Sequence, residues 1–395
     1  MTEKIKIACV VGTRPEAIKM APLVLALKRE PVFETRVLAS GQHTDMLFQA
    51  LNHFGIEADA NLNVMEHAQT LEHITSAVLE GVGSFLDENP QDLLLVHGDT
   101  TTTFASALAG FYRKTPVGHV EAGLRSHDLA RPFPEEANRL LTDRIAELYF
   151  APTLLSAENL WTEGVDKSRV FVTGNTVIDA LFWTLGRSGE TDLLGKVPEG
   201  KPLVLMTAHR RESWGEPLKE ICAAARNILG KHPELRLLVP LHKNPAARNT
   251  IIDALRGCSN AIFTEPLDYP EFVAAMNRSL YIMSDSGGVQ EEASALKKPV
   301  LILRELSERP EAIETGTGVL AGTDRHRIER EALRLLEDHA YRAAFADRSA
   351  PFGDGNASTR IVEIVKKYFA ERLGERLQWA SPSELECLSG RVPGA

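Results

Sequence analysis

The sequence predicts an α/β protein with two domains, each built on a parallel β-sheet covered by helices. Apolar runs of strand length alternate with longer helical patterns along most of the chain, which is typical of β-α-β units. Most of these runs are continuous, as strands buried on both faces should be. The 395 residues exceed the roughly 250–300 at which a single hydrophobic core stops growing, so two domains are expected.

The expected strands fall into two groups, which define the domains. The first group is 5–11, 35–39, 93–97, 117–120, 148–151 and 170–173, and the second is 203–207, 235–241, 261–264, 280–283 and 300–303. With a hinge near 174–179, residues 1–175 would form an N-terminal Rossmann-like domain and 176–358 a C-terminal one.

The end of the chain is expected to add a helix and a tail. Residues 359–374 carry apolar side chains at helical spacing, and this helix is expected to pack back on the first domain. Residues 375–395 have few large apolar side chains and are expected to form a loosely held tail.

Composition argues against several classes of protein. Hydrophobic residues make up 44% and charged residues 25%, as in soluble globular proteins. The net charge of −10 works against loose affinity for nucleic acid or anionic membranes. The longest uncharged stretch, 100–112, is shorter than the roughly 20 residues of a membrane span, and the N-terminus lacks a signal layout, so a cytoplasmic protein is expected. The 4 cysteines are scattered, which is the pattern of neither a disulfide framework nor a zinc site.

A glycine-bearing junction after the strand at 280–283 predicts a phosphate-binding site. Ser286, Gly287 and Gly288 would expose backbone N–H groups at the first turn of a helix, where an anion is favoured. Glu292, one turn further, is placed to accept hydroxyl protons from a ribose. An ordinary helix cap would look similar, but residues 12–16 form a second such junction in the other domain.

Catalytic-looking side chains follow three other strands. Glu121 comes directly after 117–120, and Asp99 and His209 come two residues after 93–97 and 203–207, at the strand ends where parallel sheets bind ligands. Each has a structural alternative: Asp99 could cap the next helix, and Glu121 could pair with Arg125.

Glu135 is a third candidate carboxylate. It follows Pro134 at an expected helix start, where an acidic residue is also ordinary for structural reasons.

A series of motifs in the same order resembles the non-hydrolysing UDP-N-acetylglucosamine 2-epimerases of bacteria, enzymes with two Rossmann-like domains of the glycosyltransferase B type facing a central cleft. The resemblance covers about residues 5–369. The motifs are Gly-Thr-Arg-Pro-Glu-Ala-Ile-Lys-Met-Ala-Pro-Leu (12–23), Gly-Gln-His (41–43), His-Gly-Asp-Thr-Thr-Thr-Thr (97–103), His-Val-Glu-Ala-Gly-Leu-Arg (119–125), Pro-Glu-Glu-Ala-Asn-Arg (134–139), Thr-Gly-Asn-Thr-Val-Ile-Asp-Ala (173–180), His-Arg-Arg-Glu-Ser (209–213), the glycine junction, and Glu-Arg-Pro-Glu-Ala (308–312).

The resemblance implies three sets of functional residues. The catalytic set would be Asp99, Glu121, Glu135 and His209. The set that binds the nucleotide and diphosphate would be Arg14, Lys19, Phe272, Ser286, Gly287, Gly288, Glu292 and Arg309. A further set, Gln42, His43, Glu136, Arg210 and His242, resembles residues that hold a second, activating UDP-N-acetylglucosamine in some bacterial members.

The match is incomplete at two positions. Leu267 stands where the family often has Gln, and Gln69 lies where members with an activator site usually carry Arg.

The chemistry of inversion at C2 favours elimination. No carbonyl group acidifies the C2 proton, so an enzyme must oxidise the sugar with NAD or expel the C1 substituent as C2 is deprotonated. The first loop is Gly12-Thr13-Arg14-Pro15-Glu16 and not the dinucleotide-binding G-x-G-x-x-G. Elimination of UDP to a 2-acetamidoglucal and its re-addition is therefore expected, without a cofactor or a metal. Reaction on two faces needs two acid–base groups, and the sequence leaves open which carboxylate serves which face.

The expected function is thus the reversible epimerisation of UDP-N-acetylglucosamine to UDP-N-acetylmannosamine by a cytoplasmic homodimer. Its product would supply N-acetylmannosamine for cell-surface polysaccharide. The partners would be UDP-N-acetylglucosamine and UDP, without nucleic acid or membrane. The first loop differs from the Arg-Ala-Asp-Tyr-like loop of relatives that hydrolyse the intermediate, which disfavours hydrolysis.

Three alternatives stay open. One is C2 epimerisation of a related UDP-diacetamido sugar, and another is a retaining glycosyltransferase of the same architecture, which would not need Asp99, Glu121 and Glu135 together. The third is a non-catalytic sugar-nucleotide sensor, which would not need the acid–base candidates.

Overall fold

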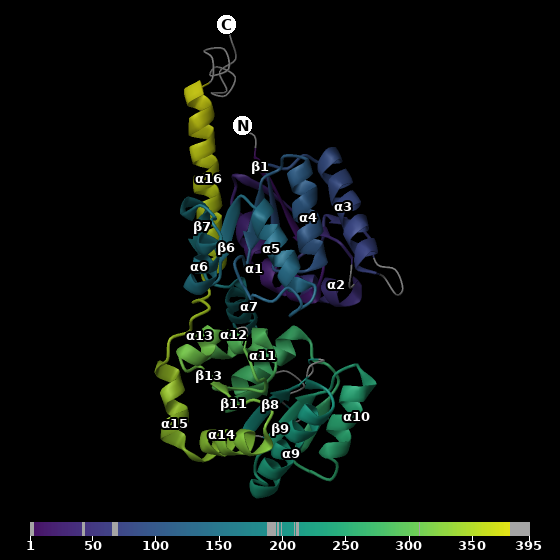
Figure 1. Cartoon of the computed structure of the whole chain (residues 1–395), viewed down its shortest axis with the longest axis vertical. Coiled ribbons are helices and arrows are strands. Elements are labelled where there is room, and N and C mark those ends of the chain that lie inside the picture. The colour runs from purple at the N-terminus through teal and green to yellow at the C-terminus, as the bar shows by residue number, and fades with distance from the viewer. Residues whose placement is uncertain are drawn as a thin grey trace. The chain divides into compact units, whose positions relative to one another are not determined.

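The chain forms two compact units (Figure 1). The computed structural model describes residues 4–41, 44–64, 70–187, 195, 197–198, 200–208, 210, 213–307 and 309–379. The first unit holds the described residues up to Asp179 and those from Gly355 onward, and the second runs from Ala180 to Asp354. The expected boundary after residue 175 lies close to this division.

The first unit contains a seven-stranded parallel sheet in the order β3-β2-β1-β4-β5-β6-β7. Its elements along the chain are β1 (Ile5–Val11), α1 (Arg14–Arg29), β2 (Phe33–Ala39), α2 (Thr44–His53), β3 (Ala60–Asn61), α3 (Leu71–Glu88), β4 (Leu93–His97), α4 (Thr101–Tyr112), β5 (Val117–Val120), α5 (Glu135–Ile145), β6 (Leu148–Ala151), α6 (Leu154–Thr162), a 3₁₀ turn (Lys167–Arg169), β7 (Val170–Val172) and α7 (Thr176–Leu185).

Helices cover both faces of this sheet. Helices α3, α4 and α5 pack side by side on one face (Figure 1). Helix α1 packs between α2 and the last helix, α16 (Ala357–Trp379). Strands β1 and β4 to β6 are buried nearly throughout, and most of their side chains are apolar on both faces, as the continuous runs in the sequence predict.

The N-terminus of helix α16 is bound to the first unit. The carboxylate of Asp179 accepts hydrogen bonds from the Ala357 and Ser358 N–H groups at 3.2 and 2.7 Å, which satisfies donors that a helix start leaves without partners. Further along, the Tyr368 hydroxyl donates to Glu147 at 2.7 Å. The helix is longer at both ends than expected and includes residues 375–379, which the sequence assigns to the tail. Residues 380–395 lie outside the described part of the chain.

The second unit contains a six-stranded parallel sheet in the order β10-β9-β8-β11-β12-β13. Its elements are β8 (Leu203–Thr207), α9 (Glu216–Lys231), β9 (Arg236–Pro240), α10 (Pro245–Ala254), β10 (Ala261–Thr264), α11 (Tyr269–Arg278), β11 (Tyr281–Ser284), α12 (Gly287–Ala295), β12 (Val300–Ile302), α13 (Pro310–Glu314), β13 (Gly318–Leu320), α14 (Arg325–Glu337), α15 (His339–Ala343) and a 3₁₀ turn (Ala344–Asp347).

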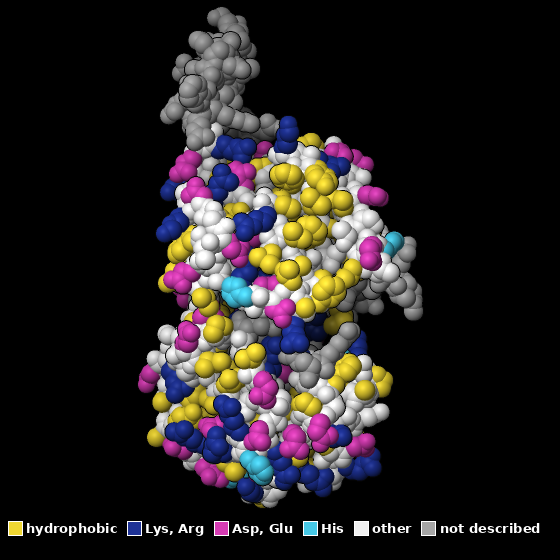
Figure 2. Space-filling view, in the orientation of Figure 1, with side chains coloured by type: hydrophobic (Ala, Val, Ile, Leu, Met, Phe, Trp, Pro, Cys, Tyr) yellow, Lys and Arg dark blue, Asp and Glu magenta, His cyan; other side chains and the backbone are white. Residues whose placement is uncertain are grey.

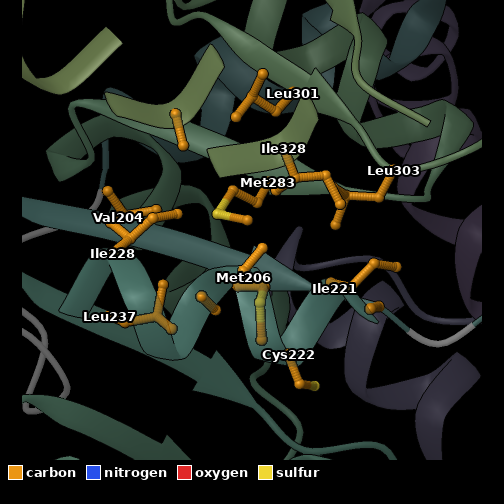
Figure 3. Close-up of a cluster of buried hydrophobic side chains, with 14 of the residues drawn as sticks. Val204, Met206, Ile221, Cys222, Ile228, Leu237, Met283, Leu301, Leu303 and Ile328 are labelled. Carbon is orange, nitrogen blue, oxygen red and sulfur yellow. The ribbon is translucent and has the colours of Figure 1, made fainter. Parts of the chain in front are cut away.

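The core of the second unit lies between its sheet and the neighbouring helices α9 and α14. Val204 and Met206 from β8 meet Ile221 from α9 and Ile328 from α14, and all four are buried (Figure 3). Full burial of such side chains contributes roughly 1.5–3 kcal/mol each. The sheet is thereby held firmly against its helices, and the loops that follow its strands are carried on a packed scaffold.

The expected strands are found, and two short ones were missed. Strands β3 and β13 have 2 and 3 residues, too few to leave an apolar run in the sequence. No helix among the described residues is long and apolar enough to cross a membrane.

Candidate active site

Glu121 is held in place by side chains from three other segments of the first unit. It follows β5 directly, in the left-handed backbone region with φ of 67°. Its Oε2 atom accepts hydrogen bonds from Lys19 Nζ at 2.5 Å and Asn175 Nδ2 at 2.7 Å. The ring of His97, the last residue of β4, lies 3.8 Å from the same oxygen. Arg125, the partner expected in the structural alternative, binds Asp143 and Glu163 instead.

Burial changes the protonation of His97. Desolvation lowers its pKa to about 3, although the charge of Glu121 acts in the opposite direction. The ring is therefore neutral at pH 7. Neither ring nitrogen has a hydrogen-bond partner within the described part of the chain.

Asp99 lies two residues beyond β4, the neighbour of β5 in the sheet. Its Oδ2 atom is 2.8 Å from Arg139 Nη2, and its side chain remains 28% exposed. Its carbonyl oxygen accepts a hydrogen bond from Asn138 Nδ2 at 3.0 Å. The capping alternative is wrong, because Thr100 is the N-cap of α4 and accepts from the Thr103 N–H.

Helix α5 begins with two glutamates in different settings. Glu135 is half-buried in the first turn, where the helix dipole favours an acidic side chain. Glu136 is fully buried, and its Oε1 atom accepts from the Ser126 and His127 N–H groups at 3.0 Å each. These contacts give Glu136 a role in shaping the preceding loop. Its part in an activator site stays a prediction.

The first glycine-bearing loop is fixed by a buried carboxylate. Thr13 and Glu16 form a reciprocal capping box at the start of α1. Glu16 Oε2 accepts from the Gly12 and Thr13 N–H groups at 2.8 and 2.6 Å, and Oε1 accepts from the Thr100 hydroxyl at 2.6 Å. Burial raises the pKa of Glu16, and these hydrogen bonds oppose that shift. Glu16 therefore joins the loop that carries Arg14 to the loop that carries Asp99.

Gly12 is required by close packing. A Cβ atom there would lie 2.4 Å from Thr102 Oγ1 and 2.8 Å from Ser40 Oγ. The substrate-binding candidates Arg14 and Lys19 follow it on α1, both partly exposed.

In the second unit, the start of α12 has the features of an anion-binding site. Ser286 is the N-cap residue, and its side chain makes no capping hydrogen bond. A Cβ atom placed on Gly287 would lie 3.8 Å from Arg309 Cζ and 3.9 Å from Arg210 Nη2, and none of the described atoms would approach one on Gly288 within 4 Å. Two guanidinium groups thus flank backbone donors at the positive end of a helix, an arrangement suited to phosphate.

The loop after β8 is bound to the same region. Asp285 Oδ2 accepts from the Arg210 N–H at 2.9 Å and from the Ser213 hydroxyl at 3.1 Å. Arg309 is anchored by a hydrogen bond from its Nε to Glu291 of α12. Both arginines are therefore positioned by acidic residues of, or adjoining, α12.

Glu292 is bound by Tyr269, a residue that the sequence did not single out, which lies on the same helix as Phe272. The Tyr269 hydroxyl donates to Glu292 Oε1 at 2.8 Å, and both side chains are buried. Tyr269 and Phe272 lie three residues apart on α11 and so share a helix face. A groove of about 560 Å³ runs beside the start of α11, with Leu267 and Glu271 in its lining.

The remaining candidates are dispersed. Arg210 lies beside Gly287, and His242 follows β9, where its Nδ1 accepts from the Asn244 N–H at 3.0 Å. Both belong to the second unit, whereas Glu136 belongs to the first. His209, Gln42 and His43 lie outside the described residues, as does Gln69.

The sequence missed the residues that hold the candidates in place. Asn138 and Arg139 could have been noticed, because they lie three and four positions after Glu135 in one motif and so share its helix face. Tyr269, one turn before Phe272, carried the same signal. Helical spacing could not have indicated Asn175, because the residue that it contacts, Glu121, is far away in the sequence.

The chain is similar to several known proteins over most of its length. A relative from Escherichia coli strain K12, named UDP-N-acetylglucosamine 2-epimerase, is 47% identical over 369 residues, covering 91% of this chain and 98% of the relative. The crystal structure of the Neisseria meningitidis UDP-GlcNAc 2-epimerase bound to UDP-GlcNAc has a TM-score of 0.87 at 44% identity, covering 92% of this chain and all of that one. The S. aureus protein MnaA in complex with UDP has a TM-score of 0.85 at 43% identity, with coverages of 93% and 97%.

The two parallel-sheet units have the glycosyltransferase B-type fold shared with these enzymes, which confirms the expected fold class. The sequence model of UDP-N-acetylglucosamine 2-epimerases matches residues 25–366. The chain belongs to the UDP-N-acetylglucosamine 2-epimerase family.

Proposed function

We propose that this chain is an isomerase that interconverts UDP-N-acetylglucosamine and UDP-N-acetylmannosamine. The observation that carries the proposal is the placement of Asp99 and Glu121 at the same edge of one sheet, after neighbouring strands, each with its own cationic partner. Two carboxylates so placed can exchange protons with a sugar carbon.

The second unit supplies what departure of UDP requires. As the C1–O bond breaks, both bonding electrons go to the diphosphate oxygen, and negative charge grows there. The start of α12 with Arg210 and Arg309 would stabilise that charge. Glu292, oriented by Tyr269, would accept hydrogen bonds from the ribose hydroxyl groups, and Phe272 would contact the uracil ring.

Proton removal from C2 would then accompany loss of UDP. Asp99 is the most suitable base, because its side chain is partly exposed. Its position is fixed by Arg139 at the carboxylate and by Asn138 at the carbonyl oxygen. The C2–H electron pair becomes the C1–C2 double bond of a 2-acetamidoglucal. Return of UDP to C1 with protonation of C2 from the opposite face gives the epimer. Glu121 and Glu135 are the candidates for that second proton transfer.

The same residues weaken the glycosyltransferase alternative. A transferase uses the nucleotide site but removes no carbon-bound proton, so it has no use for a carboxylate set at the ends of β4 and β5. The test is incubation of the purified protein with UDP-N-acetylglucosamine alone, followed by proton NMR. The proposal requires the anomeric signal of UDP-N-acetylmannosamine to appear without release of free sugar. Free N-acetylmannosamine would indicate a hydrolysing enzyme, and unchanged substrate would refute the assignment.

We further propose that the protein acts as a homodimer through the outer faces of α4 and α5. Phe111 and Tyr112 are 58% and 63% exposed, and Leu141 on the adjacent helix is 48% exposed. Figure 2 shows hydrophobic side chains gathered over this part of the first unit. Large apolar side chains that cluster on one face are typical of protein interfaces.

The described cysteines support the proposed cytoplasmic location. Cys9, Cys222 and Cys258 are free thiols, as is usual for proteins of reducing compartments.

A further inference from the structure

The backbone at Asp99 is held by side chains at two successive carbonyl groups. His119 Nε2 lies 2.7 Å from the Gly98 carbonyl oxygen. Asn138 Nδ2 donates to the Asp99 carbonyl oxygen at 3.0 Å. Gly98 has a φ of 70°, a conformation that glycine adopts without strain. The chain therefore turns sharply just before Asp99, and two side chains fix that turn.

The hydrogen-bonding geometry requires His119 to donate from Nε2. A carbonyl oxygen only accepts, so Nε2 must carry a proton toward Gly98. The other ring nitrogen, Nδ1, lies 2.6 Å from Asp143 Oδ1 and is hydrogen-bonded to it. Burial raises the pKa of Asp143, but the charges of His119 and Arg125 outweigh it, so the pKa lies below its usual value.

Asp143 is itself fixed by two further groups. Its Oδ2 atom accepts from Arg125 Nη2 at 2.7 Å and from the Gly123 N–H at 3.3 Å. Arg125 in turn donates to Glu163 at 2.6 Å. His119 and Asp143 are both buried, so the orientation of the ring is set by protein groups and not by solvent.

The parts of this network converge on one helix. Asn138, Arg139 and Asp143 all belong to α5, whose first residue is Glu135. Arg139 binds the Asp99 carboxylate, and Asn138 binds the carbonyl of the same residue. Asp143 acts on the Gly98 carbonyl through His119. Helix α5 thus fixes Asp99 at its side chain and at the backbone on either side.

We propose that His119 and Asn138 are positioning residues of the epimerase, which form a carbonyl clamp that sets Asp99 against the C2 proton of the substrate. The clamp rests on the proposed function, because it requires Asp99 to be the base. Misplacing a reacting group by about 1 Å can reduce a rate by roughly 10²-fold. Loss of the clamp should therefore slow proton transfer while the nucleotide, bound in the second unit, is still held.

The test compares two substitutions at one position. In His119→Gln the amide nitrogen can reach the place of Nε2 and keep the bond to the Gly98 carbonyl. In His119→Asn it can replace only Nδ1 and keep the bond to Asp143. Both remove a buried ring, so a loss of folding stability should affect them similarly. Asn138→Asp is a third variant, which removes the donor to the Asp99 carbonyl without changing side-chain size.

The readouts are kcat, the affinity for UDP, the melting temperature and the isotope effect on kcat with substrate deuterated at C2. For His119→Asn and Asn138→Asp we expect kcat to fall by about 10–100-fold, UDP affinity to be retained and the isotope effect to increase. For His119→Gln we expect a loss of less than about tenfold. A purely structural role would reduce the amount of folded enzyme and leave the isotope effect unchanged.

The clamp is refuted if both His119 variants lose kcat equally with an unchanged isotope effect, or if Asn138→Asp turns over at the wild-type rate. Failure of the underlying assignment is distinguishable, because a fully active Asp99→Asn enzyme would remove Asp99 from the mechanism whatever the clamp variants do. Variants that do not melt cooperatively are compared at lower temperature, where the isotope effect still reports on the folded fraction alone.

Discussion

Two residues of the first unit, Glu121 and His97, are held in arrangements that cost folding free energy. Glu121 adopts a left-handed backbone conformation, which costs a non-glycine residue roughly 1–2 kcal/mol. Its carboxylate accepts hydrogen bonds from Lys19 and Asn175. The ring of His97 is buried beside it, and neither ring nitrogen has a hydrogen-bond partner among the described residues. Such costs are typical of functional sites, where the surrounding fold stabilises an otherwise unfavourable arrangement.

Substitution of Asp99 separates a base from a structural residue. Asp99→Asn keeps the shape of the side chain and an oxygen for Arg139 but cannot accept the C2 proton. We expect kcat to fall by about 10²–10⁴-fold with KM and UDP affinity nearly unchanged. The melting temperature should change little, because Thr100 and not Asp99 caps α4. Steady-state kinetics with coupled detection of UDP-N-acetylmannosamine would measure this, and near-normal turnover would exclude Asp99 as the base.

The neutral His97 should make the protein sensitive to acid. Its pKa is about 3 in the folded protein and about 6.5 when unfolded, so between these values the unfolded chain binds more protons. Stability should therefore fall as the pH is lowered from about 6.5 toward about 3, by up to roughly 1.4 kcal/mol per pH unit. Urea unfolding of wild type and His97→Gln at pH 7, 6 and 5 tests this. The wild type should lose stability more steeply than the variant, and parallel slopes would contradict it.

One helix in each unit organises most of the candidate residues of that unit. The start of α12 provides the anion-binding donors, and α5 orients the groups around Asp99. The sequence predicted many of the strands accurately, because buried parallel strands appear as continuous apolar runs: β1, β4, β5, β6 and β8 have the expected bounds, and β11, which precedes α12, is shifted by one residue.

The same reasoning located the candidate residues but not their partners. Asp99 and Glu121 were found because they lie within two residues of the end of such runs. Asn138, Arg139 and Tyr269 share a helix face with a candidate residue, which spacing can show. Which distant loop that face meets depends on how the helix packs, which spacing alone does not specify.

Glycine at the start of α12 should be required for ligand approach and not for folding. A Cβ atom on Gly287 would make ordinary contacts at 3.8 Å, and one on Gly288 would meet none of the described atoms within 4 Å. Gly287→Ala and Gly288→Ala should therefore melt at or above the wild-type temperature, since alanine favours helix by about 1 kcal/mol. We expect their UDP affinity, measured by calorimetry, to fall by about tenfold or more, equivalent to roughly 1.4 kcal/mol.

The matched control is Gly230→Ala, at a helical glycine of α9 where an added Cβ atom would likewise meet none of the described atoms within 4 Å. It should leave UDP affinity unchanged. Undiminished affinity in both α12 variants would place the diphosphate elsewhere.

At the scale of the molecule, the chain divides so that each unit carries part of the proposed machinery. The acid–base candidates Asp99, Glu121 and Glu135 belong to the first unit, and the anion-binding donors belong to the second. Helix α16 returns to the first unit, where the contacts of Asp179 and Tyr368 bind it. The proposed reaction therefore needs both units in one protein.

Assembly can be tested through the exposed face of α4. Phe111→Asp and Tyr112→Asp each place a charge among the apolar side chains of that face, which would have to be desolvated in an interface. Sedimentation equilibrium should show a dimer for the wild type and a large shift toward monomer for these variants. Leu306→Asp, at a site 81% exposed in the second unit, is the control and should remain dimeric. A monomeric wild type would refute the proposed assembly.

The most direct test of elimination and re-addition is exchange of the C2 proton with solvent. The purified protein is incubated with UDP-N-acetylglucosamine in D2O, without added NAD or divalent metal, and both UDP-sugars are examined by NMR at equilibrium. The mechanism breaks the C2–H bond and restores it from an acid in contact with solvent, so UDP-N-acetylmannosamine should carry deuterium at C2, and recovered UDP-N-acetylglucosamine should acquire it as well. Epimerised product that retains hydrogen at C2 would contradict the mechanism.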